Sequence, residues 1–338
     1  MKYETNVPLG NLTTMRLGGL ARYVVEIATK DDLVEAVAFA RKEGLPWFVL
    51  GGGSNVIAKG DFDGVIILNR IKGFEKISED SLSVTYKVGA GEVLDSVIER
   101  LVAENLSGVE AMSAIPGYAG STPIQNVGAY GQEISDSLVE LEAYDTNSNE
   151  FVTLDPVSCG LAYRNSIFKN PETRHHIVSS ITLRLSKEGI KPPFYPALEK
   201  HLAERGVPNP SPGDIRDAVI SIRAEKVPDP EYIANAGSFF KNPIVEKPVA
   251  EKLSEMFPDA PHWDTSENKV KLAAGWLIDK AGLKSYSAHG LQIYPENALV
   301  VVNLNAESAE DLEKFKSEVI AIVQEKFGIT LEQEPETL

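Results

Sequence analysis

A glycine-rich segment, Gly51–Asn55, has the residue types and spacing of a loop that binds an anion. Its sequence is GGGSN, and it directly follows the apolar run Trp47–Leu50. Glycines let the backbone approach a ligand closely and can turn successive N–H groups inward, while the serine and the asparagine add side-chain donors. The chemistry that suits Gly51, Gly52, Gly53, Ser54 and Asn55 is therefore the binding of a pyrophosphate.

This loop matches neither of the two common phosphate-binding motifs. No Gly-Lys-Ser or Gly-Lys-Thr follows it, so it is not a Walker loop, and Val56–Gly64 does not have the pattern of the helix that a dinucleotide-binding fingerprint opens. A mobile turn is the simpler interpretation of one such loop taken alone.

A second segment of small and polar residues, within 109–135, changes that balance. It is rich in Gly, Ser, Pro, Asn and Gln, and in a compact domain a loop this long is usually functional. Two loops with little side-chain bulk favour one large planar or dinucleotide cofactor lying against the backbone. The residues of the second loop that we expect to contact it are Ser113, Ile115, Pro116, Gly117, Gly120, Ser121, Thr122, Gln125, Asn126 and Gly128.

Two further residues stand in contexts that suit catalysis. Arg164 lies between Tyr163 and Phe168, and its guanidinium stays charged at all ordinary pH values, although a surface arginine beside core aromatic residues is an equally good interpretation. Ser238 follows Gly237, where a turn serine is more common than a catalytic one. Because the sequence identifies no histidine partner for Ser238, it does not support a hydrolytic triad.

The sequence predicts no metal site. Histidines 175, 176, 201, 262 and 289 show no HExxH or related ligand spacing, which favours surface or satisfied interior roles. Cys159 is the only cysteine, so an intramolecular disulfide, a CxxC pair and a multi-cysteine zinc site are excluded. This cysteine usage is typical of a reducing compartment.

Length and charge restrict the class of partner. The 338 residues suggest two or three domains. With 33 Lys and Arg against 49 Asp and Glu, the net charge of −16 has the wrong sign for nucleic acid binding, whereas local cations can still hold a small anion. The first ten residues lack a signal-peptide pattern and no apolar run reaches membrane-spanning length, so we expect a cytoplasmic protein without membrane contact.

Hydrophobic periodicity predicts the elements that must position these loops. Asp31 and Asp32 can cap a helix that Gly44 ends, and Trp47–Leu50 then forms a buried strand. Residues 65–68 form another apolar strand, and Leu82, Val84, Tyr86 and Val88 alternate as in a half-buried strand. The clearest amphipathic helix covers 94–102.

The second half of the chain continues with strands and then mainly helices. Strands are expected at 138–144 and 177–185, and a helix around 215–222 ends near 227–230, where two prolines indicate a domain boundary. The last third predicts, in order, helix, helix, strand and helix, at 249–257, 272–281, 298–304 and 308–327.

Taken in order, these segments resemble the UDP-N-acetylenolpyruvoylglucosamine reductases, flavoenzymes of bacterial peptidoglycan synthesis. Tyr195 and Leu198, with Arg223, Lys226 and Pro228, resemble the larger type of the family, in which a tyrosine loop closes over the substrate. The segments that carry the resemblance are Thr14 to Gly19 (with Arg16 and Gly18), Gly51 to Asn55, Ile115 to Gly131, Tyr163 to Phe168, Gly237 to Pro243, Lys271 to Lys280 and Leu331 to Glu334.

The resemblance implies an α+β fold with a two-part FAD-binding module of the vanillyl-alcohol-oxidase/PCMH type and a separate α/β substrate-binding domain. The implied boundaries are 1–69 and 70–226 for the two FAD-binding subdomains and 227–327 for the substrate domain, with 328–338 returning to the second subdomain. FAD is implied to be non-covalent and NADPH to be the co-substrate. The implied substrate is UDP-N-acetylglucosamine enolpyruvate, and we expect a monomer.

The resemblance also implies roles for residues. Arg164 would stabilise an enolate at the substrate carboxylate, Ser238 with Lys241 beside it would protonate carbon, and Glu334 would complete the set, with Glu336 as the alternative carboxylate. For Arg223 and Lys226 the simpler interpretation is that they are cations at a helix end without a role in binding. The residues expected at the substrate are Tyr130, Tyr195, Arg223, Lys226, Lys241, Asn242 and Asn297.

Two other classes of function remain open at this stage. One is a different FAD-dependent oxidase or dehydrogenase on the same scaffold. The other is a non-catalytic flavoprotein that binds a nucleotide sugar. Arg164, Ser238 and the terminal glutamates discriminate between them, because a protein that only binds needs no proton donor at a reacting carbon.

Overall fold

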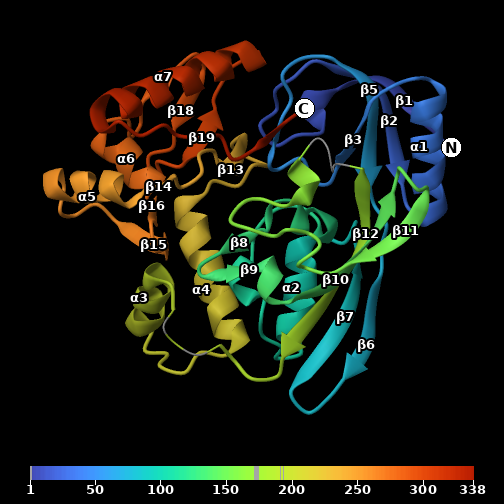
Figure 1. The fold of residues 1–338 in the computed structure, drawn as a ribbon, viewed down its shortest axis with the longest axis horizontal. Coiled ribbons are helices and arrows are strands. Elements are labelled where there is room, and N and C mark those ends of the chain that lie inside the picture. The colour runs from blue at the N-terminus through green and yellow to red at the C-terminus, as the bar shows by residue number, and fades with distance from the viewer. Residues whose placement is uncertain (1, 171–174, 191, 193) are drawn as a thin grey trace. The chain divides into compact units, whose positions relative to one another are not determined.

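The computed structural model describes residues 2–170, 175–190, 192 and 194–338 (Figure 1). The chain forms two units. The N-terminal unit comprises Met1–Val7, Ala21–Gly52 and Asp63–Ala224, and the C-terminal unit comprises Pro8–Leu20, Gly53–Phe62 and Glu225–Leu338. The division near 224 lies close to the prolines at 227–230, but two N-terminal segments group with the C-terminal residues, which periodicity does not reveal.

The first sheet of the N-terminal unit carries the glycine-rich loop. Its strand order is β1 (Glu4–Pro8), β2 (Leu20–Ile27), β5 (Phe62–Asn69) and β3 (Trp47–Leu50). Helix α1 (Lys30–Lys42) packs Leu33, Ala36, Val37 and Ala40 against this sheet. The helix cap was expected at Asp31 or Asp32, but it is Thr29. The Thr29 hydroxyl accepts a hydrogen bond from the Asp32 backbone N–H, and the Asp32 carboxylate accepts one from the Thr29 backbone N–H.

The second sheet of the same unit is antiparallel. Its strand order is β11 (Glu150–Leu154), β10 (Leu138–Asp145), β12 (His176–Ser186), β7 (Ser83–Gly89) and β6 (Phe74–Glu79). Helix α2 (Leu94–Ala103) buries Leu94, Val97, Ile98 and Leu101 in the same core as residues of β7, β10 and β12. The predicted alternation was wrong at Leu82, which lies before β7 and is 62% exposed.

The long segment 109–135 has no regular element of ordinary length, as expected. It contains short 3-10 turns and two paired two-residue strands, β8 (Gly128–Ala129) and β9 (Gln132–Glu133). Helices α3 (Pro196–Glu204) and α4 (Pro212–Lys226) close the unit, and their apolar side chains share a core with Ala111 from this segment. Helix α4 is thereby placed beside the loop.

The C-terminal unit has two small antiparallel sheets and three helices. One sheet has the order β13 (Asn235–Ser238), β19 (Val300–Asn303), β18 (Leu291–Ile293) and β17 (Ser287–Ala288), and the other has β14 (Ile244–Glu246), β16 (Lys269–Leu272) and β15 (His262–Ser266). Helices α5 (Lys247–Met256), α6 (Ala274–Lys280) and α7 (Ala309–Phe327) contribute to one core with them. The predicted helix, helix, strand and helix are confirmed, and the short strands between them are additions.

Among the residues that the structure describes, the last strand of the chain pairs outside 70–226, the range to which the resemblance implied that the tail returns. Strand β20 (Glu336–Thr337) instead runs parallel to β4 (Val56–Ile57) within the C-terminal unit. The physical reason is hydrogen bonding, because Glu336 donates to the Asn55 carbonyl, Leu338 donates to Ile57, and Lys59 donates to Leu338. These bonds satisfy the edge of a strand too short to be stable alone.

Two whole-chain properties follow from the described residues. None of the helices that they form has both the length and the apolar character that a membrane crossing requires. Cys159 is fully buried in the core of the N-terminal unit. Burial is the main cause, and the charge of Asp155 the second cause, that raises the pKa of its thiol to about 11.

Candidate functional site

Gly51 and Gly52 lie where two parallel strands end. Strands β3 and β5 pair in parallel from Trp47 and Val65 to Leu50 and Leu68, so the loop leaves the sheet at the edge where ligands of such sheets bind. A Cβ added at Gly52 would lie 3.0 Å from the Cα of Gly117, and one at Gly51 would lie 3.4 Å from the Tyr118 ring. The structure thus brings the two predicted small-residue loops into contact.

The backbone of this junction retains unused donors. Within the part of the chain that the structure describes, the N–H groups of Gly51, Gly52 and Gly117 donate no hydrogen bond, although all three residues are partly buried. Partly buried backbone donors normally find an acceptor, which can be a ligand. The phosphate oxygens of FAD supply such acceptors, so these residues fit that cofactor.

Arg70 is a residue of this junction that sequence reasoning missed. It directly follows β5, its guanidinium lies 4.7 Å from the centre of the Tyr118 ring, and its Nη1 donates to the Gly51 carbonyl over 3.1 Å. The position after a strand parallel to β3 was the available signal, because the carboxyl ends of neighbouring parallel strands share an edge.

Several predicted cofactor contacts already use their side chains within the loop. The hydroxyls of Ser113, Ser121 and Thr122 donate to the carbonyls of Glu110, Tyr118 and Ala119 over 2.6, 2.7 and 2.7 Å. Their donor protons therefore order the turns. What these residues offer a ligand is a small backbone surface and hydroxyl lone pairs.

The Arg164 guanidinium is hydrogen-bonded to backbone carbonyls of the same loop. Its Nη2 donates to the Gly128 carbonyl over 2.8 Å, and its Nη1 lies 3.5 Å from the Asn126 carbonyl. Arg164, Asn126 and Tyr130 have positive φ values of 51°, 48° and 48°. Such conformations cost about 1–3 kcal/mol each for residues other than glycine and cluster at functional sites. This observation favours a ligand site around 126–130 and 164.

Three predicted substrate residues of the N-terminal unit come together. The Tyr130 and Tyr195 rings meet edge to face with centres 5.7 Å apart. Arg223, on α4, donates from Nε to the Ala114 carbonyl over 3.2 Å and interacts electrostatically with the Tyr130 hydroxyl. Burial lowers the pKa of the Arg223 guanidinium, and it raises the pKa of the Tyr130 phenol. Arg223 is therefore more than a cation at a helix end.

The C-terminal unit places Ser238 and Glu334 on adjacent segments. Ser238 ends β13, Phe240 bridges to Gln333, and Glu334 donates its backbone N–H to the Phe239 carbonyl over 2.9 Å. Glu334 is 9% exposed, whereas Glu336 belongs to β20 and pairs with Val56. The backbone of Glu334 thus pairs with the segment of Ser238, and that of Glu336 pairs with β4.

Lys241 lies on the same segment as Ser238. Its backbone N–H donates to the Glu332 carbonyl over 2.9 Å, and its Nζ lies 3.7 Å from the Glu332 carboxylate. The Asn242 carboxamide oxygen accepts from the Ala274 N–H over 2.9 Å at the start of α6. Asn242 thus has a structural role in ordering that helix.

The remaining predicted contacts of the C-terminal unit have varied surroundings. Asn297 is a turn residue whose side-chain oxygen accepts from the Leu299 N–H over 3.1 Å. Lys226 is exposed at the end of α4, and Ser54 and Asn55 are half-buried. A Cβ at Gly53, which has a φ of 65°, would lie 2.0 Å from the Leu12 carbonyl, so internal packing alone requires this glycine.

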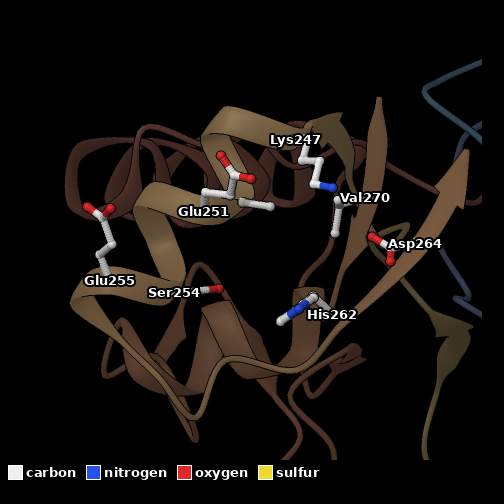
Figure 2. Close-up of a pocket in the computed structure, with 8 residues that line it drawn as sticks. Lys247, Glu251, Ser254, Glu255, His262, Asp264 and Val270 are labelled. Carbon is white, nitrogen blue, oxygen red and sulfur yellow. The ribbon is translucent and has the colours of Figure 1, made fainter. Parts of the chain in front are cut away.

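A separate pocket of about 550 Å³ lies in the C-terminal unit between α5 and strands β15 and β16 (Figure 2). Figure 2 shows Lys247 and Asp264 at one end and Glu255 at the other. Its lining residues are Lys247, Ala250, Glu251, Ser254, Glu255, His262, Asp264 and Val270. None of the predicted site residues is among them.

Comparison with known proteins decides the family. A profile described as "FAD binding domain" matches residues 21–155, and one described as "UDP-N-acetylenolpyruvoylglucosamine reductase, C-terminal domain" matches residues 229–338. A UDP-N-acetylenolpyruvoylglucosamine reductase from Ralstonia nicotianae is 39% identical over 335 residues, which are 98% of this chain and 98% of that protein. The chain belongs to the UDP-N-acetylenolpyruvoylglucosamine reductase family.

Other members of the UDP-N-acetylenolpyruvoylglucosamine reductase family agree. The Pseudomonas aeruginosa protein is 35% identical over 335 residues, 99% of this chain and 98% of its own length. The crystal structure of the enzyme from Thermus caldophilus matches with a TM-score of 0.64 at 24% identity, covers 99% and 98% of the two chains, and supports the fold. The family, the α+β fold with an FAD-binding module, FAD as the cofactor and the class of FAD-dependent oxidoreductase are thereby confirmed.

Proposed function

We propose that this enzyme reduces UDP-N-acetylglucosamine enolpyruvate to UDP-N-acetylmuramate with NADPH, a step in the synthesis of peptidoglycan precursors. The observation that carries the proposal is full-length similarity to reductases of that name, combined with two glycine-rich loops in contact at the carboxyl ends of parallel strands. FAD, when bound, carries the electrons from NADPH to the substrate.

We propose that the cofactor is held by the backbone of the two small-residue loops. Gly51, Gly52 and Gly117 supply unused N–H donors, and Arg70 supplies a cation beside them. Residues of 1–69 and 70–226 would bind FAD without a covalent bond, and residues 227–327 would form the substrate domain. Gly53 has a packing role that does not depend on the cofactor.

Ser238 is the proposed proton donor. Reduction of the enolpyruvyl double bond leaves negative charge delocalised toward the substrate carboxylate, and a proton must then reach carbon. The Ser238 hydroxyl has a donor proton, and the ammonium of Lys241 on the same segment would stabilise the alkoxide that is left. Glu334, whose backbone pairs with Phe239, would complete the set.

Arg164 is the proposed group that stabilises the developing enolate. Its guanidinium remains protonated, and its bonds to the carbonyls of Asn126 and Gly128 hold it in one place. Arg223, with Tyr130 and Tyr195 around it, would bind an anionic group of the nucleotide sugar. Lys226, Asn242 and Asn297 are proposed as further substrate contacts. We further propose that the enzyme is a monomer in the cytoplasm.

The test separates the two halves of the reaction. In anaerobic stopped-flow absorbance, the Ser238→Ala variant should be reduced by NADPH at the parent rate, because that step needs no proton at the sugar. Its reoxidation by the enolpyruvyl substrate should slow about a hundredfold or more, the scale for losing a positioned general acid. Ser238→Cys should retain part of the rate because a thiol still donates.

A matched control is Ser254→Ala, on α5 of the same unit, which should leave both steps unchanged. If Ser238→Ala reoxidises as fast as the parent, the serine does not donate the proton. If the parent protein binds FAD but the enolpyruvyl sugar does not speed its reoxidation, the proposed reaction is wrong and a non-catalytic flavoprotein is the better description.

A further inference from the structure

A group of three potential metal ligands lies in the N-terminal unit, and none of them belongs to the proposed cofactor or substrate site. Asp145 ends β10, His176 begins β12, and His175 immediately precedes it. Asp145 and His176 are register partners on these neighbouring strands, which lie side by side in Figure 1. Strand pairing therefore joins residues whose spacing in the sequence gives no metal-ligand signal.

The donor atoms are close enough to share one ion. One ligand atom from each residue lies within 4.8 Å of the other two. Nε2 of His175 is 3.8 Å from Oδ1 of Asp145, and the two imidazole centres are 4.2 Å apart. Around a tetrahedral zinc ion with bonds of about 2.0–2.1 Å, donor atoms are separated by roughly 3.3 Å. Small side-chain rotations would reach that geometry.

The carboxylate is held ready for such a bond. Oδ1 of Asp145 accepts the Asn147 N–H over 2.8 Å, and Oδ2 accepts the Ser148 hydroxyl over 3.0 Å. A carboxylate oriented by outer hydrogen bonds is the arrangement found around metal ligands.

The guanidinium of Arg41 bonds to the turn that follows Asp145. Arg41 donates to the Asn149 side chain and to the Thr146 carbonyl, both on the turn between β10 and β11. Among the described residues, His175 is the ion-pair partner that the structure gives Asp145. The side chains of His175 and Asp145 are 26% and 17% exposed, which leaves a path for an ion and for a water molecule.

We propose that Asp145, His175 and His176 bind one divalent transition-metal ion, with zinc as the ion whose ordinary ligands match best and with water in the fourth position. Two imidazoles and a carboxylate are borderline ligands that suit zinc better than magnesium or calcium. The ion would tie the turn after β10 to the start of β12. This site is independent of the proposed reaction.

The test uses the whole protein without a polyhistidine tag. Isothermal titration with Zn²⁺ should show one equivalent bound, and Zn²⁺ should raise the melting temperature, because an ion that binds only the folded state stabilises it. His176→Gln and the double variant Asp145→Asn/His175→Gln should each weaken binding by about a hundredfold or more, since loss of an outer partner alone costs about 10–100-fold.

The variants are chosen to preserve the fold. Asn at 145 can still accept the Asn147 N–H, and the backbone bond from Thr146 to the His175 carbonyl does not involve the side chain. His201→Gln, on α3, is the matched control and should bind Zn²⁺ like the parent. No uptake of Zn²⁺ by the parent, or unchanged affinity in variants with normal flavin absorbance and circular dichroism, would overturn the proposal.

Discussion

Two arginines on helix α4 are held in opposite ways. Arg216 forms a bidentate ion pair with Asp95, in which Nη1 lies 2.6 Å from Oδ1 and Nη2 lies 3.0 Å from Oδ2. The Asp95 partner raises the pKa of Arg216. Arg223 donates instead to the neutral Ala114 carbonyl, and burial lowers the pKa of its guanidinium.

The difference separates a structural cation from one suited to a ligand. A buried charge is stable when a charge of the opposite sign compensates it, and Asp95 provides this for Arg216. Asp95 also interacts electrostatically with Arg223, but within the part of the chain that the structure describes no ion pair holds the Arg223 guanidinium at contact distance. A phosphate or carboxylate would supply the missing charge, which supports our proposal that Arg223 binds the nucleotide sugar.

The largest expected effect is the loss of stability in Arg216→Met. The side chains of Arg216 and Asp95 are 11% and 35% exposed, and the variant leaves Asp95 partly buried without its partner. We expect the free energy of unfolding to fall by about 2–4 kcal/mol, somewhat less than for a fully buried pair. Urea denaturation followed by circular dichroism measures it.

The double variant Asp95→Asn/Arg216→Met sharpens this expectation. Asn at 95 can still accept the Ala114 N–H, which Asp95 Oδ1 accepts over 2.6 Å. The double variant should therefore be more stable than the sum of the two single losses predicts. Strict additivity would show that the pair is not coupled.

Next in size is the effect of Arg223→Met on substrate binding. We expect the KM for the nucleotide sugar to rise about 10–100-fold, the scale of a lost charged hydrogen bond, while flavin reduction by NADPH stays normal. Arg205→Met, at the exposed C-terminus of α3, is the matched control. An unchanged KM together with a large loss of stability would make Arg223 a second structural arginine and abolish the contrast.

A smaller effect concerns pH. The Asp95 pKa is lowered, because hydrogen bonds from Arg216 and Ala114 outweigh the burial that raises it. A depressed pKa in the folded state stabilises the fold above the unfolded pKa of about 3.9, and this contribution is lost as the pH falls through the lower folded pKa. The stability difference between the parent and Asp95→Asn should therefore be constant near neutrality and shrink in acid. A constant difference down to low pH would contradict the assignment.

The smallest expected effect is that of Tyr195→Phe. Tyr195 is 43% exposed, and its ring, which the variant keeps, makes the edge-to-face contact with Tyr130. We expect the KM for the nucleotide sugar to rise no more than about threefold, because only an exposed hydroxyl is lost. A tenfold rise in steady-state assays would instead place that hydroxyl in direct contact with the substrate.

The elements that sequence predicts well are those with a strong local period. Helix α2 follows an uninterrupted amphipathic pattern, and its structure matches that pattern within a residue. Strands of two to four residues, such as β13 and β17, have too few positions to show a period. The capping role of Thr29 was missed because Asp32 has an equally good cap chemistry and only the backbone shows which residue caps.

The contact between the two small-residue loops was predictable, because their composition is a local property of the sequence. The GGGSN and 113–128 loops could be paired from composition, and the structure brings Gly52 against Gly117. Arg70 and the trio of Asp145, His175 and His176 depend on which strands are neighbours, which a single sequence does not state. Gly53 was predicted to contact the cofactor, but its close approach to Leu12 already requires a glycine. The sequence alone does not distinguish a glycine required by packing from one required by a ligand.

The buried thiol of Cys159 makes the native chain convenient for fluorescence labelling. With no exposed surface and a pKa of about 11, this cysteine should resist maleimide dyes at neutral pH, because the reactive thiolate is both scarce and shielded. One cysteine introduced at an exposed position of each unit, for example at Glu204 and at Glu255, would then take up the dyes selectively. Energy transfer between a donor and an acceptor dye would report the separation of the two units directly, with and without NADPH or nucleotide sugar.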